Sequence, residues 1–214
     1  MVSGGSRDAT PGLAPDEPEA CKLAAAHPAY LDDPTPLLIA AQQNRTEVLR
    51  MLLDMGMPVD LAARNGQRAL HEAAGAGALD AIRLLIEAGA DIDKRGGDYK
   101  ATPLGHGVFW KRQAVIDLIA PLSRCPHDLA WGGCVERLCE VLAEQPDLAN
   151  TLNPRRYTPL FMLPDDEEAA AQVAETLLAA GADRNRRNPE GKTAEQVARH
   201  RGLDEAADVL AGET

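Results

Sequence analysis

Residues 65–94 read NGQRALHEAAGAGALDAIRLLIEAGADIDK and carry two apolar stripes at helical spacing. The stripes consist of Leu70, Ala73 and Ala74, and of Ile82, Leu85 and Ile86. Gly77 separates them, and Gly-Ala-Asp at 89–91 ends the second. Because residues three and four apart share a helix face, this pattern predicts a helix, a tight turn and a second, antiparallel helix. Neither helix can bury its apolar face alone, so the unit requires neighbours.

The same pattern recurs along the chain. Thr35 opens TPLLIAA and Arg68 opens RALHEAA, 33 residues later. Thr102-Pro-Leu follows at a similar distance, and a second series opens at Thr158 and Thr193. A period near 33 that carries T-P-L-H-x-A is typical of the ankyrin repeat, so the chain resembles the ankyrin-repeat family over about residues 18–211. The resemblance implies an all-α solenoid of stacked helix-turn-helix units with short hairpin turns, here as a small, single-domain array. The alanine- and arginine-rich composition suggests a bacterial protein.

The repeat pattern divides the chain into a tail and one domain. Residues 1–15, rich in Gly, Ser, Asp and Pro, are expected to form a disordered tail. The ankyrin-repeat domain at 16–211 comprises a half repeat at 16–32, repeats at about 33–64, 65–97, 98–123, 124–155 and 156–187, and a capping repeat at 188–211. The recurring threonines Thr35, Thr102, Thr158 and Thr193 are expected to cap the first helix of their repeats through their hydroxyl groups.

The third repeat lacks its closing turn. The next helix start, Arg124, follows Thr102 by only 22 residues, so about eleven residues of the projecting hairpin are missing. The stability of a repeat array is roughly a sum of repeat and neighbour-interface contributions. We therefore predict a weak junction near 121–126, at which the two halves of the array open separately. Repeat five instead gains two residues, within the acidic segment 164–168.

Composition restricts the classes of function. The formal net charge of −11 disfavours sequence-independent binding to DNA or RNA, whose affinity comes from neutralising phosphates with Lys and Arg. It also disfavours binding to an anionic membrane surface, and no run of about 18 apolar residues indicates a membrane span. Residues 1–15 contain no apolar run typical of a signal peptide. Four cysteines without a dense framework indicate a reducing compartment, so we expect a cytoplasmic protein.

One cluster of metal-ligating residue types lies at 125–139. Cys125, His127, Cys134 and Cys139 contain no C-x-x-C spacing, which structural zinc sites commonly use. Small buried apolar residues are the preferred interpretation of these cysteines, and no metal or cofactor is predicted. A metal-dependent module built on Cys125, His127 and Cys134 stays open as an alternative. No phosphate loop, H-E-x-x-H or nucleophile elbow occurs in the chain, so no enzymatic activity is predicted.

The resemblance also indicates which residues bind a partner. In the ankyrin family the two residues after the inner Ala-Ala pair line a concave groove, which the hairpin tips border. This register places Gly75, Ala76 and Gly132 along the groove, together with larger side chains. The predicted partner-binding residues, the last three of which lie near the C-terminal end, are Gln42, Gln43, Phe109, Trp110, Trp131, Arg199, His200 and Arg201. For Trp131, a role as filler of the space left by the missing hairpin stays open.

The function implied by the resemblance is non-catalytic binding of another protein. The concave groove and the hairpin tips would present rigid side chains to that partner, and the chain would act as a cytosolic regulator, inhibitor or adaptor. The isolated chain is expected to be a monomer. An alternative is a structural subunit that is buried in a larger assembly.

Overall fold

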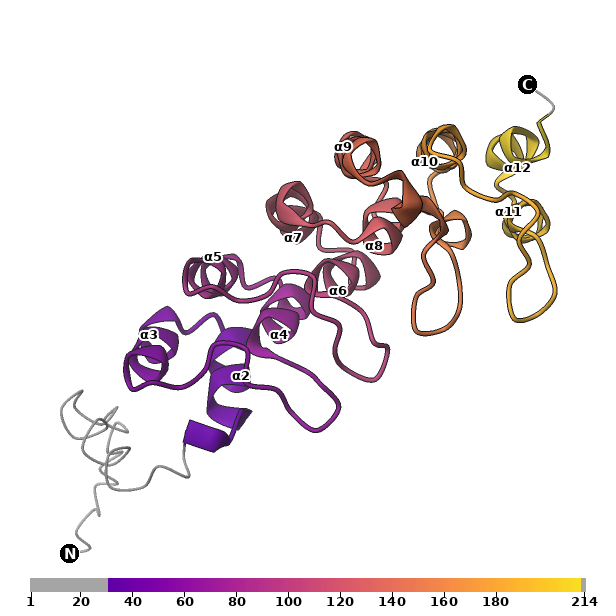
Figure 1. Ribbon diagram of the computed structural model, residues 1–214. Helices are drawn as coiled ribbons and strands as arrows, with labels where there is room; N and C mark the ends of the chain where they lie inside the picture. The colour runs from indigo at the N-terminus through magenta and orange to yellow at the C-terminus, as the bar shows by residue number, and fades with distance from the viewer. Residues whose placement is uncertain (1–30, 213–214) are drawn as a thin grey trace, which may run out of the picture.

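The computed structural model describes residues 31–212, and this part of the chain is an all-α solenoid (Figure 1). Each repeat pairs an inner with an outer helical element. The inner elements are α2 (Thr35–Gln42), α4 (Ala69–Ala76), α6 (Pro103–Phe109), α8 (Pro126–Trp131), the 3₁₀ turn η4 (Pro159–Phe161) and α11 (Ala194–Arg201). The outer helices are α3 (Thr46–Asp54), α5 (Leu79–Glu87), α7 (Gln113–Ile119), α9 (Val135–Glu144), α10 (Glu167–Ala179) and α12 (Asp204–Ala211). The predicted tail and most of the predicted half repeat lie outside the described residues.

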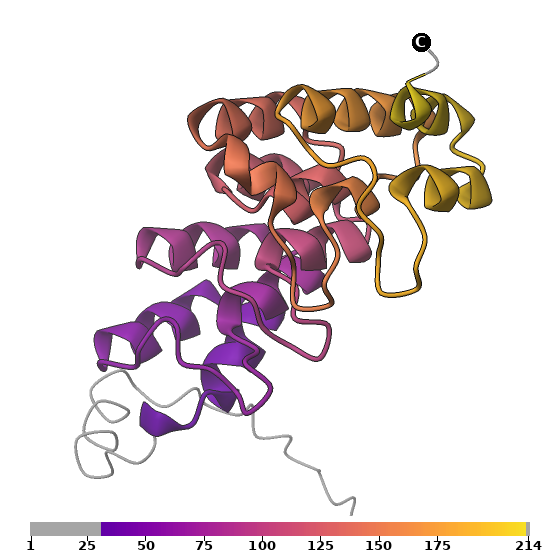
Figure 2. The same ribbon diagram turned by 45° about the vertical axis from the view of Figure 1, so that its right-hand side comes forward.

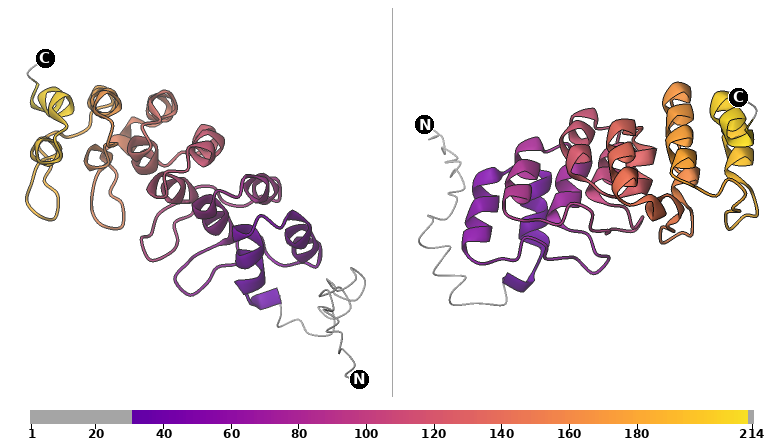
Figure 3. Two further views of the ribbon diagram at one scale, coloured as in Figure 1. Left: turned by 180° about the vertical axis from the view of Figure 1, so that it is seen from behind. Right: turned by 45° about the horizontal axis from the view of Figure 1, so that its top comes forward.

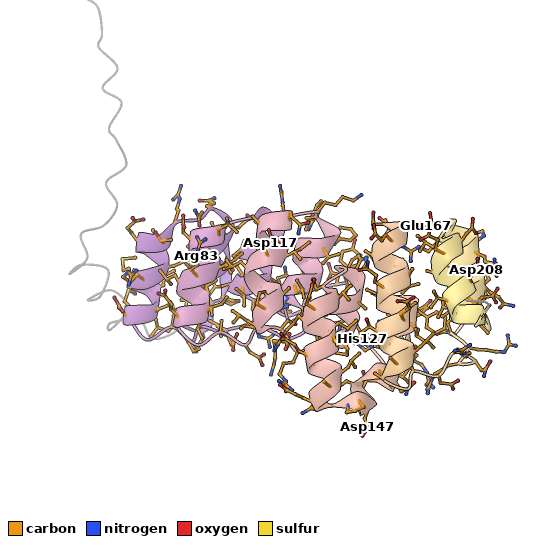
Figure 4. The ribbon with its side chains drawn as sticks, turned by 90° about the horizontal axis from the view of Figure 1, so that it is seen from above. Arg83, Asp117, His127, Asp147, Glu167 and Asp208 are labelled. Atoms are coloured by element: carbon orange, nitrogen blue, oxygen red, sulfur yellow. The ribbon has the colours of Figure 1, made fainter. Side chains whose placement is uncertain are left out.

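The outer helices lie side by side across one face of the molecule (Figure 4). Figure 4 labels Arg83 on α5, Asp117 on α7, Glu167 at the start of α10 and Asp208 on α12. Seen from behind, the hairpins between repeats all leave the opposite side of the stack (Figure 3). The inner helices therefore stand between the outer layer and the hairpins.

The two predicted stripes form part of one continuous core between the layers. Leu70, Ala73 and Ala74 of α4 and Ile82 and Leu85 of α5 are almost fully buried. Small alanine side chains let the inner helices approach closely, and the leucines fill the space between the layers. Gly56 and Gly89 follow outer helices with φ values of +92° and +86°, the left-handed conformation that glycine adopts without strain.

The predicted threonine caps are correct for only two repeats. Thr102 Oγ1 accepts the backbone N–H of Gly105, and Thr193 forms a capping box with Gln196. The prediction is wrong for Thr35, because α2 begins at Thr35 itself and the Asp33 carboxylate accepts the Thr35 N–H. It is also wrong for Thr158, whose hydroxyl is buried without a hydrogen-bond partner in the described structure.

Repeat five departs furthest from the regular pattern. Its inner element is the single 3₁₀ turn η4 rather than an α-helix. Pro164 lacks a backbone N–H and disfavours the helical conformation of Leu163, so the helix cannot continue. The acidic segment then starts the longest outer helix, α10, because Asp166 accepts the Ala169 N–H at 2.9 Å. The extra residues thus extend the outer layer and shorten the inner one.

Side chains from one repeat accept backbone N–H groups of the next. Asp60 Oδ2 accepts the Asp91 N–H at 3.1 Å, and Asn150 Oδ1 accepts the Asp183 N–H at 2.8 Å. Asp93 forms the corresponding bonds at the junction, where it accepts the Arg124 N–H at 2.7 Å and the Ser123 hydroxyl at 2.6 Å. The hydrogen-bonded connection between neighbouring repeats is therefore kept where the hairpin is absent.

The chain passes from α7 through the 3₁₀ turn η2 (Ala120–Leu122) directly into α8, without a projecting loop (Figure 1). The carboxylate of Asp128, which is 3 % exposed, lies at this junction. It accepts the Thr102 hydroxyl at 2.9 Å and the Cys125 thiol at 3.3 Å, and it lies 3.9 Å from Arg95. We call Asp93, Arg95, Thr102, Ser123, Cys125 and Asp128 the junction network.

Separate opening of the two halves stays a prediction. Because the hairpin between α7 and α8 is missing, fewer apolar contacts join the halves there than between regular repeats. Amide hydrogen exchange should show that residues 126–211 open independently of residues 35–120. The free energy of opening should be lower for residues 126–211. Equal protection on both sides of the junction network, with a single opening free energy, would contradict it.

Candidate functional site

The inner helices and the hairpins enclose a groove of about 940 Å³, which we call the central groove. It begins at Leu38 and Gln42 of α2 and reaches Phe161 and Met162 at η4. Three hairpins border it, and Figure 2 shows the hairpins projecting on the same side of the stack. The groove therefore spans both halves of the array and crosses the junction.

Aromatic side chains dominate the central groove. It is lined by Tyr99, Phe109, Trp110, Trp131, Tyr157 and Phe161. These are six of the seven Phe, Trp and Tyr residues of the chain, and the seventh, Tyr30, lies outside the described residues. Tyr99, Phe109 and Trp110 are 60 %, 47 % and 56 % exposed. Large apolar rings gathered at one exposed site typify an interaction surface.

The rings contact one another and are held in place. Phe109 stacks on Tyr99 with centroids 5.4 Å apart and meets Trp110 edge to face at 5.1 Å. Trp110 rests on Gly75, where an added Cβ would lie 3.3 Å from the indole. Aromatic pairs at these separations are favourable, so the rings are ordered before any partner arrives. Such preorganisation reduces the entropy that binding costs.

The missing hairpin leaves the hairpins on either side of the junction to face each other. The Arg155 guanidinium lies 6.0 Å from the ring centroid of Tyr99 and so connects the two hairpin tips. Trp131, the last residue of α8, is half-buried, and its ring centroid lies 6.4 Å from that of Phe109. Trp131 thus lines the groove, and its role as filler of the space left by the hairpin stays a prediction.

The structure brings together only part of the predicted site. Gln42, Phe109, Trp110 and Trp131 line the central groove, as do Gly75 and Ala76. Gln43 is exposed beside it, and the three predicted residues of α11 lie at the C-terminal end of the array. Arg199 pairs with Glu195 and Asp208. Arg201 donates to the carbonyl groups of Leu163 and Pro164 and to the Asp165 carboxylate.

Sequence reasoning missed the groove residues that come from the hairpins and from η4. Tyr99 and Arg155 lie on hairpin tips, Tyr157 follows the second of these tips, and Phe161 occupies the position of the T-P-L-H histidine in repeat five. The available signal was composition, because aromatic residues make up only 3 % of the chain and nearly all of them fall between 99 and 161. Such a concentration indicates one site rather than a distributed core.

Two histidines form the floor of the groove. His71 Nε2 donates to the Lys94 carbonyl at 2.9 Å, and its ring meets His106 edge to face at 5.2 Å. Burial, together with the neighbouring His106, lowers the pKa of His71 to about 4. Burial also lowers the pKa of His106. Both rings are therefore neutral near pH 7, and His71 has a structural role in holding the hairpin.

Three members of the cysteine and histidine cluster form internal bonds, whereas Cys139 is exposed, so the predicted burial is wrong for Cys139. The Cys125 thiol donates to Asp128, and burial raises its pKa to about 12, which disfavours the thiolate that a metal requires. His127 Nε2 lies 3.0 Å from the Tyr157 carbonyl. The Cys134 thiol donates to the Gly132 carbonyl at 3.7 Å, and burial raises the pKa of this thiol to about 11. Within residues 31–212, no three His, Cys, Asp or Glu side chains are arranged to hold a metal ion.

Comparison with known proteins agrees with this architecture. A family model described as ankyrin repeats, in three copies, matches residues 13–96. The first relatives found are much longer proteins, of which the chain spans only 4–6 %. The NF-kappa-B inhibitor cactus of Drosophila melanogaster is 48 % identical over 50 residues, or 22 % of this chain and 10 % of that protein.

Among the described residues, no helix has the length and apolar character needed to cross a membrane.

Two bacterial proteins match most of the chain. The putative ankyrin repeat protein YahD of Escherichia coli is 27 % identical over 197 residues, which cover 83 % of this chain and 94 % of YahD. The crystal structure of an ankyrin repeat domain from Acinetobacter baumannii superposes with a TM-score of 0.56 at 25 % identity, covering 84 % of this chain and 98 % of that one. Together with the stacked helix pairs and the repeated T-P-L motif, these matches show that the described part of the chain has the fold of the ankyrin-repeat proteins.

Proposed function

We propose that this protein binds one partner protein in the central groove and thereby acts as a regulator, inhibitor or adaptor without catalytic activity. Ankyrin repeats are generally protein-protein interaction modules. The observation that supports this particular site is the exposure of Tyr99, Phe109 and Trp110 within one groove. Aromatic residues at the centre of a preformed surface are the residues that most often anchor a protein interface.

We further propose that the protein acts as a monomer in the cytoplasm. The three described cysteines are free thiols, in keeping with a reducing compartment. Of the residues predicted to bind the partner, Gln42, Phe109, Trp110 and Trp131 form the core of the proposed site because they share the groove. Gln43, Arg199, His200 and Arg201 are proposed to contribute at its periphery, through the rate of association rather than through anchoring contacts.

Replacing Phe109 and Trp110 together with alanine should weaken partner binding at least about 30-fold, because an anchor contributes about 2 kcal/mol or more. Both side chains are exposed, so the thermal melt of the variant should stay close to that of the wild type. The test is affinity capture from the cells that make the protein, with wild type and variant as baits, followed by a titration with the captured partner.

The matched control removes exposed apolar side chains outside the groove. Leu122 and Leu152 are 47 % and 41 % exposed and do not line it, so a double variant with alanine at both should capture the same partner as the wild type. If the Phe109 and Trp110 variant retains the partner at full affinity while remaining folded, the central groove is not the binding site.

A further inference from the structure

The charged side chains of the central groove differ from those of the rest of the molecule. The chain as a whole has a formal net charge of −11. The groove lining nevertheless contains four basic and three acidic side chains, apart from histidine. The groove lining therefore has a small excess of positive charge on a protein that is acidic as a whole, and such local charge can steer and select the partner.

The acidic side chains of the groove already have donors within the chain. Glu72 accepts from Gln42 at 3.3 Å, and Asp98 accepts from Asn65 at 3.2 Å. Asp128 is buried within the junction network and accepts from the Thr102 hydroxyl. Asp128 is therefore inaccessible to a ligand and lies beside Arg95. Glu72 and Asp98 keep their charge, so two acidic side chains stand against the three basic ones described next.

Three of the basic side chains lack an acidic partner. Lys100 Nζ donates to the Asn65 carbonyl at 3.0 Å, and Arg112 Nε donates to the Gly75 carbonyl at 3.3 Å. Arg155 lies over the Tyr99 ring. None of the three forms an ion pair within residues 31–212. All three are exposed, so each retains positive charge for a ligand beside the aromatic rings.

We infer that the occupant of the central groove is an acidic peptide segment, in which Asp or Glu residues lie next to apolar or aromatic residues. The inference rests on the proposed groove site and adds the chemistry of its partner. The carboxylates would pair with Lys100, Arg112 and Arg155, and the apolar side chains would pack on Tyr99, Phe109 and Trp110.

A short acidic segment suits the groove better than a nucleic acid strand. Exposed rings and unpaired cations would also stack bases and bind phosphates. A nucleic acid strand, however, carries a charge at every nucleotide and would extend beyond the groove, over a surface with a strong net negative charge. A peptide can confine its few carboxylates to the groove. The choice between these two classes is settled by experiment.

The first experiment selects ligands for the full chain from a library of random twelve-residue peptides displayed on phage. The expected result is enrichment of sequences that combine Asp or Glu with Leu, Phe, Tyr or Trp. Enrichment of neutral or basic sequences, or no enrichment at all, would overturn the inference. An eight-residue oligothymidylate that bound more tightly than the best selected peptide would also overturn it, in favour of a nucleic acid ligand.

The second experiment measures binding directly. The two tryptophans of the chain both line the groove, so fluorescence excited at 295 nm reports its occupancy by a ligand that lacks tryptophan. The most enriched such peptide should bind at least about tenfold more tightly than its counterpart with Gln in place of Glu and Asn in place of Asp. Raising the salt concentration should reduce this difference, because exposed charges are screened. Equal affinity of the two peptides would contradict the inference.

Charge-reversal variants distinguish an effect of the groove charges from an effect of the net charge of the protein. An Arg112→Glu and Arg155→Glu variant should lose the acidic peptide, whereas Arg50→Glu with Arg184→Glu makes the same change in net charge outside the groove lining and should keep it. If the reversal unfolds the protein, Arg155→Gln alone provides the test, with a smaller loss expected. Equal losses in the two double variants would overturn the inference.

Failure of this inference is distinguishable from failure of the groove site. Selected peptides that lack acidic residues, and that no longer bind the Phe109 and Trp110 alanine variant, would contradict the acidic chemistry and retain the groove. Acidic peptides that still bind this variant at full affinity would contradict both.

Discussion

Replacing Asp128 with alanine should lower the free energy of unfolding by about 3 kcal/mol, and the melting temperature by about 10 °C. The carboxylate is buried and accepts hydrogen bonds from Thr102 and Cys125 next to the Arg95 guanidinium. Its removal leaves buried donors without an acceptor and one cation without its counter-ion, and both are costly. Urea denaturation monitored by circular dichroism measures the change.

Two variants serve as controls for this prediction. Asp128→Asn keeps an acceptor for Thr102 and nearly the same shape, so it should cost less than the alanine variant. Asp117→Ala removes an exposed carboxylate from α7, where it accepts from Gln113, and should change stability by no more than about 0.5 kcal/mol. A loss of stability at Asp128 no larger than that at Asp117 would show that the junction network does not hold the halves together.

Acidification should destabilise the protein between about pH 6.5 and pH 4 through His71. Burial depresses the pKa of the folded-state imidazole from 6.5 to about 4. Above pH 6.5 the ring is neutral in the folded and the unfolded state, so His71 does not change the free energy of unfolding. Between the two pKa values the unfolded chain binds a proton that the folded chain does not, which favours unfolding. The loss reaches about 3 kcal/mol near pH 4 and then levels off, because each pKa unit corresponds to about 1.4 kcal/mol.

The matching variant is His71→Gln, which can donate to the Lys94 carbonyl but does not titrate. It should be less stable than the wild type at pH 7.5 and lose less stability between pH 6.5 and pH 4. A remaining slope is expected, because burial also lowers the pKa values of His106 and His127. Urea titrations at half-unit pH steps measure both slopes. Identical slopes for variant and wild type would exclude His71 as the source.

The features repeated along the chain were predictable from the sequence. The 33-residue period fixed the register of the inner helices, and Phe109, Trp110 and Trp131 line the central groove as this register predicts. The same register also predicted Gln43, His200 and Arg201, which do not line it. The short spacing between Thr102 and Arg124 also predicted the absent hairpin, because the length of chain needed for a loop is simply not there.

The features that depend on non-repeated contacts were not predictable in this way. Tyr99 and Tyr157 line one groove only because two hairpins more than 50 residues apart in the sequence face each other across the junction. Asp128 was not recognised as a structural residue. Gly105 occupies the position of the T-P-L-H histidine in repeat three, and a Cβ there would lie 3.0 Å from Asp128 Oδ1. In repeats with a following hairpin, the histidine at this position bonds that hairpin. In repeat three, which has no following hairpin, the Asp128 carboxylate occupies the space beside Gly105.

The absent hairpin has a consequence for how the protein responds to its partner. The central groove crosses the junction, so a bound segment that contacts both Tyr99 and Tyr157 touches both halves of the array. Opening the junction would break those contacts, and the free energy of opening therefore rises with ligand concentration as RT ln(1 + [L]/Kd). At a hundredfold excess over Kd this adds about 2.7 kcal/mol. The partner would thus act as a clamp that makes two separately opening segments unfold as a single cooperative unit.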